Sequence, residues 1–264
     1  MTRLSRFKDP LYKIARLAGV AILKIYEDPS LFNVDYKSDK SPLTAADKAA
    51  NDIIIDGLKA LPEKYPIISE ESKKQDYEIR KQFEYCWLVD PLDGTKEFIK
   101  RNDEFTVNIA LVKSGQPVVG LIYVPVSGAC YFAALGEGAW RLDVDPELRL
   151  KCASFDINQA GLRVLCSRSH LSEATQDYVD QLDAAVLVPQ GSALKFTVMA
   201  EGEGDIYPRI GPTMEWDTAA AHILLNEAGG EIIEFASGKP LKYNKESLLN
   251  PDFIAFGDGQ LNQV

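Results

Sequence analysis

The chain begins with two stretches in which apolar residues recur at helical spacing. In the first stretch the apolar positions are Leu11, Ile14, Ala18, Ile22 and Ile25. Asp9 and Pro10 precede them as an N-cap and a first-turn proline would, so we predict an amphipathic helix there. A second helix is predicted to begin near Thr44, because Thr44 and Asp47 have the spacing of a capping box. The polar segment 37–40 between the two helices is predicted to be a loop.

From residue 65 onward the pattern changes to short apolar runs separated by turn residues. In the first half these runs predict strands at 66–68, 86–89, 106–112, 118–124 and 130–134. Segments 113–116 and 125–128 have the composition of hairpin turns, so we expect an antiparallel sheet.

The second half of the chain mixes strand patterns with helical patterns. Strands are predicted at 163–166, 185–188, 206–208 and 231–235, and helices at 171–182, 192–200 and 218–227. Gly229 and Gly230 are predicted to end the last helix. Strands and helices that alternate in both halves predict an α/β layered architecture.

Length and composition are consistent with one folded unit. The chain has 264 residues, 46% of them hydrophobic, and contains no linker or low-complexity tract. We therefore predict a single unit over 1–264, with approximate halves at 1–160 and 161–264. The net charge of -10 argues against binding to nucleic-acid polymers, which requires basic residues. A small phosphorylated ligand remains compatible with this charge, because a few local cations or metal ions are enough to bind it.

The sequence also bears on location. It contains no run of about 20 apolar residues that would span a membrane, and its N-terminus lacks the apolar core of a signal peptide. We expect a cytoplasmic protein, with peripheral contact at the inner face of the membrane as an alternative. The cysteines form no paired motif and are predicted to be buried free thiols: Cys86, Cys130, Cys152 and Cys166. The oligomeric state is left open.

Acidic residues follow an apolar run at one prominent place. Asp90 and Asp93 bracket Pro91-Leu92 directly after the run 86–89, so the predicted strand leads into a loop that carries two acids. Magnesium prefers oxygen ligands, and two neighbouring ions need a carboxylate that bridges them. The competing interpretation is an ordinary Asp-Gly turn.

Further acids lie at other element boundaries. Glu70 and Glu71 follow another short apolar run, Asp217 lies at the start of a predicted helix, and Asp47 lies in the first turn of the second helix. Each has a structural explanation, as a solvated loop, an N-cap or a capping-box partner. Taken one at a time, those explanations are the stronger ones.

Three segments together resemble the signature motifs of the inositol monophosphatase superfamily. They are Asp90-Pro91-Leu92-Asp93-Gly94-Thr95, the upstream Glu70-Glu71 pair and the downstream Trp216-Asp217-Thr218-Ala219-Ala220. Further phrases at 87–102, 105–111, 167–170 and 207–209 look like the CysQ-type branch, the bacterial 3'(2'),5'-bisphosphate nucleotidases. The resemblance runs over nearly the whole chain and implies an αβαβα sandwich.

The resemblance also implies two or three bound Mg²⁺ ions. One ion would be held by Glu70, Asp90 and the carbonyl of Leu92. A second would be held by Asp90, Asp93 and Asp217, with Asp90 bridging the two.

The implied catalytic residues are Asp47, Glu70 and Thr95. The first ion would lower the pKa of its bound water, and Thr95 would position or accept the proton. Thr95 would be oriented by Asp47, which would leave its capping role. No residue beside the metal loop forms a recognised nucleophilic arrangement, so direct attack by water is favoured over a phosphoenzyme.

Substrate binding is expected to involve the metal loop and the second half of the chain. Backbone N–H groups of Gly94 and Thr95 are expected to contact the phosphate, which approaches closely because Gly94 has no side chain. A second phosphate needs further donors. The substrate-binding set that the resemblance implies is Glu70, Asp93, Gly94, Thr95, His170, Ser192, Lys195, Arg209 and Asp217. The alternatives are that Ser192 caps a helix and that Lys195 and Arg209 are solvated charges. His222 is predicted to pack on a helix face.

The activity implied by the resemblance is Mg²⁺-dependent hydrolysis of adenosine 3',5'-bisphosphate to AMP and phosphate, in sulfur assimilation, with inhibition by lithium. One alternative is an inositol-monophosphate or sugar-phosphate phosphatase on the same scaffold. Another is a non-catalytic sensor of Mg²⁺ or of a phosphorylated ligand. A sensor would not need the water-activating pair Asp47 and Thr95, which favours an enzyme.

Overall fold

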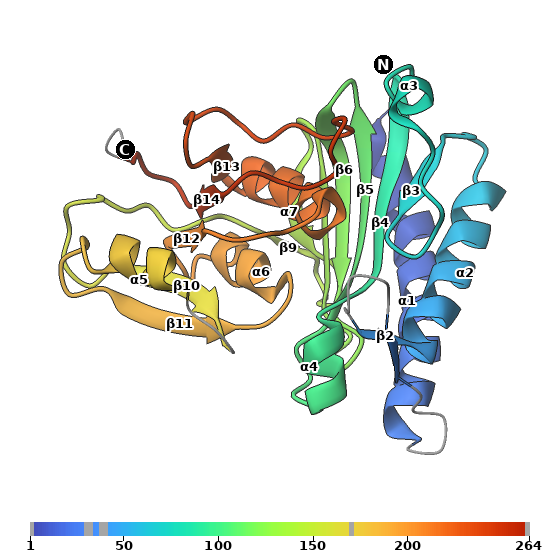
Figure 1. Cartoon of the computed structure of the whole chain (residues 1–264), viewed down its shortest axis with the longest axis horizontal. Helices are drawn as coiled ribbons and strands as arrows, with labels where there is room; N and C mark the ends of the chain where they lie inside the picture. Colours follow the sequence, from blue (N-terminus) through green and yellow to red (C-terminus); the bar gives the residue numbers. More distant parts are fainter. Residues whose placement is uncertain (1–2, 29–33, 37–41, 169–171, 262–264) are drawn as a thin grey trace.

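The computed structural model describes residues 3–28, 34–36, 42–168 and 172–261. The chain is built in layers, in the order helix, sheet, helix, sheet, helix (Figure 1). Helices α1 (Lys8–Glu27) and α2 (Ala45–Ala60) cover one face of a seven-stranded sheet. Helices α6 (Leu194–Ala200) and α7 (Glu215–Ala228) lie between it and a five-stranded sheet, and α5 (Glu173–Val179) covers the far face. The predicted αβαβα sandwich is confirmed.

The seven-stranded sheet has its strands in chain order and is antiparallel except for the first pair, β3 and β4, which is parallel. Its strands are β3 (Ile67–Ser69), β4 (Tyr85–Asp93), β5 (Thr106–Lys113), β6 (Gln116–Tyr123), β7 (Cys130–Ala134), β8 (Gly138–Arg141) and β9 (Leu148–Arg149). The predicted antiparallel sheet is therefore confirmed, and the last two short strands extend it.

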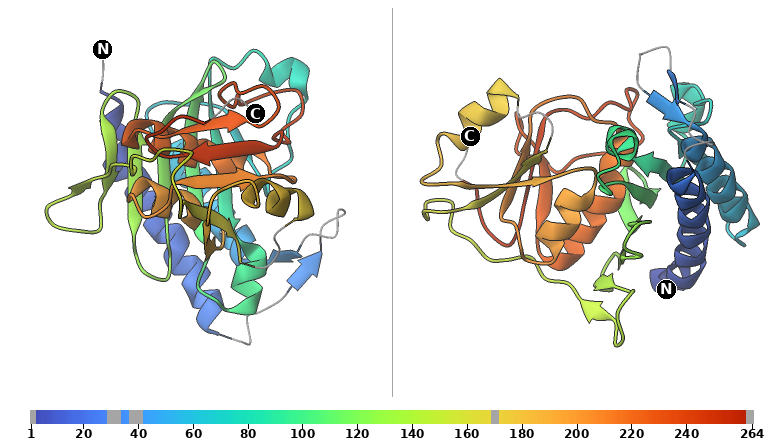
Figure 2. Two further views of the ribbon diagram at one scale, coloured as in Figure 1. Left: turned by 90° about the vertical axis from the view of Figure 1, so that its left-hand side faces the viewer. Right: turned by 90° about the horizontal axis from the view of Figure 1, so that it is seen from below.

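Both faces of this sheet are buried, which explains its nearly continuous apolar runs. On β4, Trp87 and Val89 pack in the core under α1 and α2, whereas Cys86 and Leu88 pack in the core around α7. The same alternation continues along β5 and β7. Figure 2 shows α1 and α2 on one outer side of the molecule and the second sheet on the other.

The second sheet has the strand order β11-β10-β12-β14-β13, with β14 antiparallel to its neighbours. Its strands are β10 (Arg163–Ser167), β11 (Val186–Gln190), β12 (Ile206–Arg209), β13 (Glu231–Glu234) and β14 (Phe253–Phe256). The last strand was not predicted. Its apolar run is only four residues long and is recognisable as a strand only through its pairing with β12 and β13.

Helix boundaries differ in detail from the sequence predictions. Helix α1 begins at Lys8, after a 3₁₀ turn η1 (Leu4–Phe7), so Asp9 lies in its first turn instead of at the N-cap. Helix α7 begins at Glu215, earlier than predicted, and Gly229 ends it in a left-handed conformation as expected. The capping box of Thr44 and Asp47 is confirmed. The predicted loop 37–40 lies outside the described residues.

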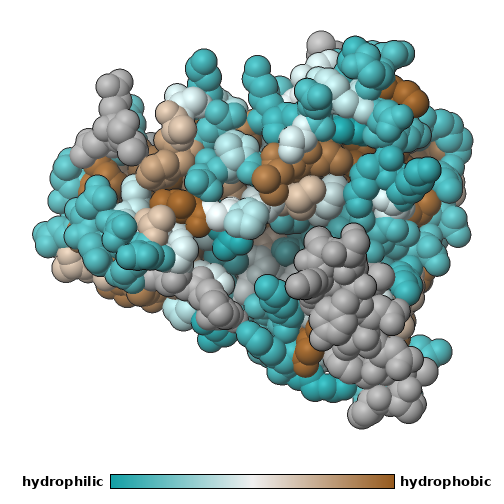
Figure 3. Space-filling model, viewed as in Figure 1, coloured by the Kyte–Doolittle hydropathy of each residue, from teal (hydrophilic) through white to brown (hydrophobic). Residues whose placement is uncertain are grey.

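The remaining elements are short. They are α3 (Tyr77–Arg80), α4 (Thr95–Lys100) and a separate antiparallel pair of strands, β1 (Val34–Tyr36) and β2 (Pro42–Thr44). All four cysteines are buried free thiols, as predicted. No described helix is long and apolar enough to cross a membrane. The face drawn in Figure 3 is mainly hydrophilic, with apolar residues in small patches.

Helix α7 packs directly on strand β6, and Gly120 makes this possible. A Cβ atom at Gly120 would lie 2.5 Å from the carbonyl oxygen of Ala220 and 2.5 Å from Cγ2 of Ile223. We expect Gly120→Ala to destabilise the protein by about 1–3 kcal/mol, since the backbone of α7 must shift. Urea unfolding followed by circular dichroism measures this change.

Gly57→Ala in α2 is the matched control. Its added Cβ would lie 2.6 Å from Cγ1 of the buried Ile14, so a core side chain must shift but the backbone of α1 need not. Alanine is favoured over glycine in a helix by about 1 kcal/mol, which offsets part of this cost. We therefore expect Gly57→Ala to destabilise the protein less than Gly120→Ala. Equal destabilisation by the two variants would contradict the close packing of α7 on β6.

Candidate active site

Strand β4 carries the two central acids, Asp90 and Asp93, toward a cleft that Asp93 lines. Asp90 pairs with Asn108 on β5, and Asp93 pairs with Thr106, so three steps on β4 oppose two on β5. The extra residue makes a β-bulge, at a point where Pro91 has no N–H to donate to the ladder. The bulge changes the direction of the chain between Asp90 and Asp93, as a loop that presents both acids requires.

Thr95 and Asp47 are in contact. The Thr95 hydroxyl donates to Asp47 Oδ1 over 3.2 Å and lies 3.4 Å from the Leu92 carbonyl oxygen. Asp47 Oδ2 accepts from the backbone N–H of Thr44 over 2.8 Å. The expectation that Asp47 leaves its capping role is therefore wrong, because one carboxylate oxygen caps α2 while the other accepts from Thr95.

Glu70 and Asp217 reach the site from neighbouring elements. Glu70 directly follows β3, and its backbone N–H donates to the Val89 carbonyl over 3.1 Å. Asp217 lies in the first turn of α7, where its Oδ2 accepts from the backbone N–H of Met214 over 2.9 Å. Met214 is the N-cap, so the alternative in which Asp217 is the N-cap is wrong.

Burial and mutual repulsion act together on these carboxyl groups. Asp90 is 2% exposed, and burial raises its pKa well above the usual range. The other acids raise it further: Glu70, Asp93, Asp217 and Asp47. Burial and then the Asp93 charge likewise raise the pKa of Asp217. Five carboxylates thus share one electrostatic environment, in which a divalent cation would offset their repulsion.

The chemistry of this donor set fits a hard cation such as Mg²⁺, because it consists of carboxylate and carbonyl oxygens. The carboxylates are held by protein donors in the structure. Asp90 Oδ1 accepts from the Leu92 N–H over 3.0 Å, and Asp93 Oδ2 accepts from the Ser192 hydroxyl over 2.6 Å. With the side chains in these positions, no three of the described acidic, histidine or cysteine groups converge closely enough to bind one ion. Metal binding therefore requires some of these carboxylates to move closer together than they lie here.

A cleft of about 340 Å³ opens beside the acids. Residues predicted to bind substrate line it together: Asp93, Gly94, Ser192, Lys195, Arg209 and Asp217. Predicted site residues from both halves of the sequence therefore line the same cleft. His170 lies outside the described residues.

Ser192 and Lys195 form part of the wall of this cleft. Ser192 has a left-handed backbone and binds Asp93, and it does not cap α6, whose N-cap is Ala193. Lys195 donates to the carbonyl oxygens of Ser192 and Gln190, over 2.8 and 3.3 Å. Burial lowers its pKa to about 8. The alternatives in which Ser192 caps a helix and Lys195 is a solvated charge are therefore wrong.

Arg209 keeps unused hydrogen-bonding capacity at the cleft. Its Nη2 donates to the Pro212 carbonyl over 3.1 Å, while its Nε is buried and has no hydrogen-bond partner among the described residues. Buried donors normally have a partner, so this atom marks a place for a ligand acceptor or a water.

His222 lies apart from the cleft, as predicted. It is buried on α7, where its ring nitrogens lie 2.9 Å from the Tyr243 hydroxyl and 2.6 Å from Glu231 Oε1. It is a satisfied core residue.

The sequence did not predict the ion pair of Glu104 and Arg168, which is connected to the cleft through Gly191. Glu104 accepts from the backbone N–H of Gly191 over 2.9 Å and from Nε of Arg168 over 2.8 Å. It joins the segment after α4 to the loop before α6 and to the end of β10. These residues are far apart in the sequence, and no local pattern identifies them.

Comparison with known proteins agrees with this geometry. The model of the inositol monophosphatase family matches residues 3–260. The chain belongs to the inositol monophosphatase family.

Within the inositol monophosphatase family, the chain is similar to proteins named 3'(2'),5'-bisphosphate nucleotidase CysQ. It is 44% identical to that of Escherichia coli (strain K12), over 93% of this chain and 97% of the relative. The CysQ crystal structure from Bacteroides thetaiotaomicron superposes with a TM-score of 0.83 and 41% identity, over 96% of this chain and 98% of that one. The inositol monophosphatase structure from Anabaena (Nostoc) sp. has a TM-score of 0.74 and 26% identity, over 98% and 92%.

We expect the repulsion at Asp90 to lower the stability of the metal-free protein at neutral pH. Folding raises the pKa of Asp90 and Asp217, so without metal the folded state binds more protons than the unfolded state. The contribution of these groups to stability falls as the pH rises from about 4 toward neutrality. We expect Asp90→Asn to raise the melting temperature of the metal-free protein by about 3 °C at neutral pH. We also expect Mg²⁺ to raise the melting temperature of the unchanged protein, and Asp90→Asn to abolish this rise.

Differential scanning calorimetry with EDTA or Mg²⁺ tests this expectation. Asp258→Asn is the control, because Asp258 accepts a hydrogen bond from Ser154 in an exposed region. If Asp90→Asn leaves the stabilisation by Mg²⁺ unchanged, Asp90 does not belong to the metal site.

Proposed function

We propose that this chain is a Mg²⁺-dependent 3'(2'),5'-bisphosphate nucleotidase that hydrolyses adenosine 3',5'-bisphosphate to AMP and phosphate, in sulfur assimilation. The main support for the proposal is the buried group of acids around Asp90. This group adjoins a cleft that is lined by Lys195 and Arg209. The 44% identity to a protein of that name supports it. Cytoplasmic location is part of the proposal, and the buried free thiols are consistent with a reducing compartment.

We assign the metal ligands as follows. Glu70, Asp90 and the Leu92 carbonyl would hold one ion, and Asp90, Asp93 and Asp217 would hold a second. Whether two or three ions bind is left open. When bound, the ions supply a nucleophilic water at neutral pH and neutralise charge on the leaving oxygen. Lithium is expected to inhibit the enzyme.

Thr95 is proposed to position or accept the proton of the attacking water, and Asp47 to orient Thr95 and act as the final acceptor. The Thr95 hydroxyl is already hydrogen-bonded to Asp47 Oδ1 over 3.2 Å. Burial raises the pKa of Asp47, and a more basic carboxylate is a better proton acceptor at neutral pH. Because Asp47 Oδ2 is fixed by Thr44, the free direction of the carboxylate is the one that faces Thr95. This paired arrangement favours catalysis over the alternative of a passive Mg²⁺ or ligand sensor.

The scissile phosphate is proposed to lie against the backbone N–H groups of Gly94 and Thr95. Gly94 has a left-handed φ of 92°, and a Cβ there would lie 2.9 Å from the Glu104 carbonyl oxygen. Glycine therefore permits both the turn and the close packing of this loop against the Glu104 backbone. Ser192 and Asp93 border the same space.

The second phosphate is proposed to bind Arg209. Lys195, which lines the same cleft, is proposed to add positive charge. Arg209 has the unpartnered Nε, and guanidinium groups bind phosphate through several donors. Lys195 already donates to two carbonyl oxygens, so its main effect is electrostatic. His170 is proposed to contact the substrate as well.

Removing the Thr95 hydroxyl should lower turnover. We expect Thr95→Val to reduce kcat by about 10²–10⁴-fold at saturating Mg²⁺, the usual contribution of general acid–base catalysis. KM should change little, because backbone contacts to phosphate remain. Steady-state phosphate release from adenosine 3',5'-bisphosphate measures both quantities.

Thr175→Val is the control for Thr95→Val. Thr175 is a buried threonine on α5, in the far helical layer. Unchanged kcat in Thr95→Val would remove Thr95 from the proposed mechanism.

Arg209 should separate a bisphosphate substrate from a monophosphate. We expect Arg209→Gln to raise KM for adenosine 3',5'-bisphosphate by about 10–100-fold, as for the loss of a charge-assisted contact. Hydrolysis of adenosine 3'-monophosphate should be nearly unaffected. The assay includes inositol 1-phosphate and fructose 1,6-bisphosphate, each with and without Mg²⁺.

Two outcomes would contradict the substrate assignment. One is unchanged activity on the bisphosphate after both Arg209→Gln and Lys195→Gln. The other is a clear preference of the unchanged protein for inositol 1-phosphate or the sugar phosphate, which would favour that alternative on the same scaffold.

A further inference from the structure

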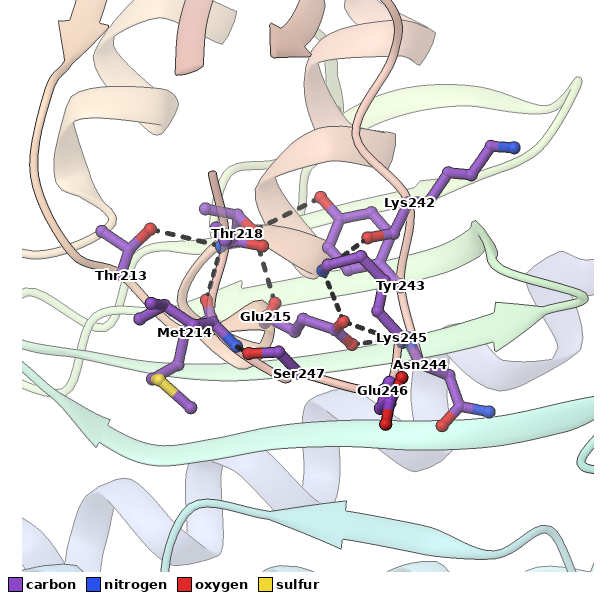
Figure 4. Close-up of polar contacts among 12 residues, drawn as sticks. Thr213, Met214, Glu215, Thr218, Lys242, Tyr243, Asn244, Lys245, Glu246 and Ser247 are labelled. Carbon is purple, nitrogen blue, oxygen red and sulfur yellow. Dashed lines mark hydrogen bonds and ion pairs between the residues drawn. The ribbon is translucent and has the colours of Figure 1, made fainter. Parts of the chain in front are cut away.

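A buried carboxylate lies at the first position of α7, outside the group of acids described above. Glu215 is 0% exposed, and it accepts from the backbone N–H groups of Asn244 and Lys245 over 2.5 and 3.0 Å. The Lys245 ammonium also donates to it over 2.5 Å. Figure 4 shows these donors converging on Glu215 from one segment of chain. We call this segment, residues 243–250, the clamp segment.

The clamp segment binds the first turn of α7 at several further points. The Glu215 N–H donates to the Leu248 carbonyl over 2.9 Å. The side-chain amide of Asn250 donates to the Met214 carbonyl over 2.8 Å and to the Thr218 hydroxyl over 3.0 Å. Asp217 belongs to the same turn, so its backbone is held by these contacts.

Arg80 fixes the other side of the clamp segment. It is 4% exposed, and its guanidinium donates to Asn244 Oδ1 and to the carbonyl oxygens of Lys245 and Glu246, over 2.9, 3.0 and 3.0 Å. Its Nε donates to the Gln75 carbonyl over 2.9 Å. Arg80 therefore joins the clamp segment to the stretch of chain that leads from Glu70 to α3.

A second link joins the same two regions. Lys74 donates to the Glu70 carbonyl, and its ammonium lies 4.8 Å from the centre of the Trp216 ring. Trp216 is the neighbour of Asp217 in the chain. The segments that carry Glu70 and Asp217 are thus connected through Lys74 directly and through Arg80, the clamp segment and Glu215.

We propose that Arg80 and Glu215 are positioning residues that set the relative placement of Glu70 and Asp217 for metal binding. The inference rests on the proposed function, since it takes Glu70 and Asp217 as metal ligands. Neither Arg80 nor Glu215 lines the cleft, and neither belongs to the proposed metal ligands. They act through the clamp segment, which offers three acceptors to the Arg80 guanidinium and three donors to the Glu215 carboxylate.

The chemistry of both residues makes them hard to replace. Lysine at position 80 has one nitrogen in place of three and cannot reproduce the fork of hydrogen bonds. Glutamine at position 215 would bring an amide NH₂ against the Asn244 or Lys245 N–H, so one buried donor would lose its acceptor. Outer residues that orient metal ligands commonly affect metal affinity about 10–100-fold.

Direct Mn²⁺ binding to the enzyme without substrate tests the proposal. Electron paramagnetic resonance measures free Mn²⁺ in titrations of the unchanged protein, Arg80→Lys, Glu215→Gln and Asn244→Gly. Glycine accepts the left-handed backbone of Asn244 and removes only its side chain, which provides a mild variant if the others fail to fold. We expect Mn²⁺ affinity to fall about ten-fold or more in Arg80→Lys and Glu215→Gln, and less in Asn244→Gly.

Arg163→Lys is the matched control. Arg163 also makes several hydrogen bonds, to Asp205 and to the Gly202 carbonyl. It begins β10 and makes no hydrogen bond or ion pair to α7 or the clamp segment among the described residues. It should lose stability to urea and keep its Mn²⁺ affinity. In Arg80→Lys and Glu215→Gln, the Mg²⁺ concentration for half-maximal activity should rise by the same factor by which Mn²⁺ affinity falls. If kcat at saturating Mg²⁺ is preserved, this result supports a positioning role.

The outcomes separate this inference from the proposed function. If the unchanged protein binds Mn²⁺ and releases phosphate while all three folded variants keep its Mn²⁺ affinity, the positioning role is wrong and the proposed function stands. If the unchanged protein neither binds Mn²⁺ nor hydrolyses the nucleotide, the proposed function itself fails. A loss of affinity in Arg163→Lys equal to that in Arg80→Lys would reduce the effect to general stability and also overturn the inference.

Discussion

Repulsion among carboxylates that surround Asp90 is the constraint on which the rest of this structure depends. Glu70, Asp93, Asp217 and Asp47 all raise the pKa of Asp90, which is itself excluded from water. In isolation such a group of charges would move apart or take up protons. The fold must therefore hold the acids in place from several directions, and the layered architecture provides this support.

The acids are attached to several elements of the fold, with Asp90 and Asp93 on the same strand. Asp90 lies in β4, which is buried on both faces between the cores under α1 and α7. Glu70 is bonded to the same strand through the Val89 carbonyl. Asp217 lies in the first turn of α7, and α7 packs closely on the sheet because Gly120 has no side chain. The acids meet because two cores pack independently on the two faces of one sheet.

The local parts of this arrangement could be predicted from the sequence. Thr44 and Asp47 are three residues apart, and their spacing alone predicted the helix start that the structure contains. The strand that leads to Asp90 was likewise evident from its apolar run, although its length was underestimated because the bulge continues the pairing to Asp93. These interactions form within a few residues, so a sequence pattern records them.

The parts that could not be predicted depend on contacts between distant segments. Glu104 meets Gly191, and Arg80 meets Asn244, across 87 and 164 positions of sequence. A glutamate or an arginine in a polar stretch normally indicates a solvated surface, and only the folded chain shows that Glu215 and Arg80 are buried. The metal motif was recognisable because its residues form contiguous phrases, whereas the supporting residues are scattered.

The N-termini of two helices help to stabilise the charge of two of the acids, Asp47 and Asp217. Asp47 and Asp217 each lie three residues after the N-cap of a helix, and each accepts a hydrogen bond from the backbone N–H of that N-cap residue. The N-terminal end of a helix carries partial positive charge, which stabilises a carboxylate there. The capping bond also fixes the direction of each side chain. The capping role of Asp47 is therefore compatible with the catalytic role proposed for it, since one carboxylate oxygen caps the helix and the other accepts from Thr95.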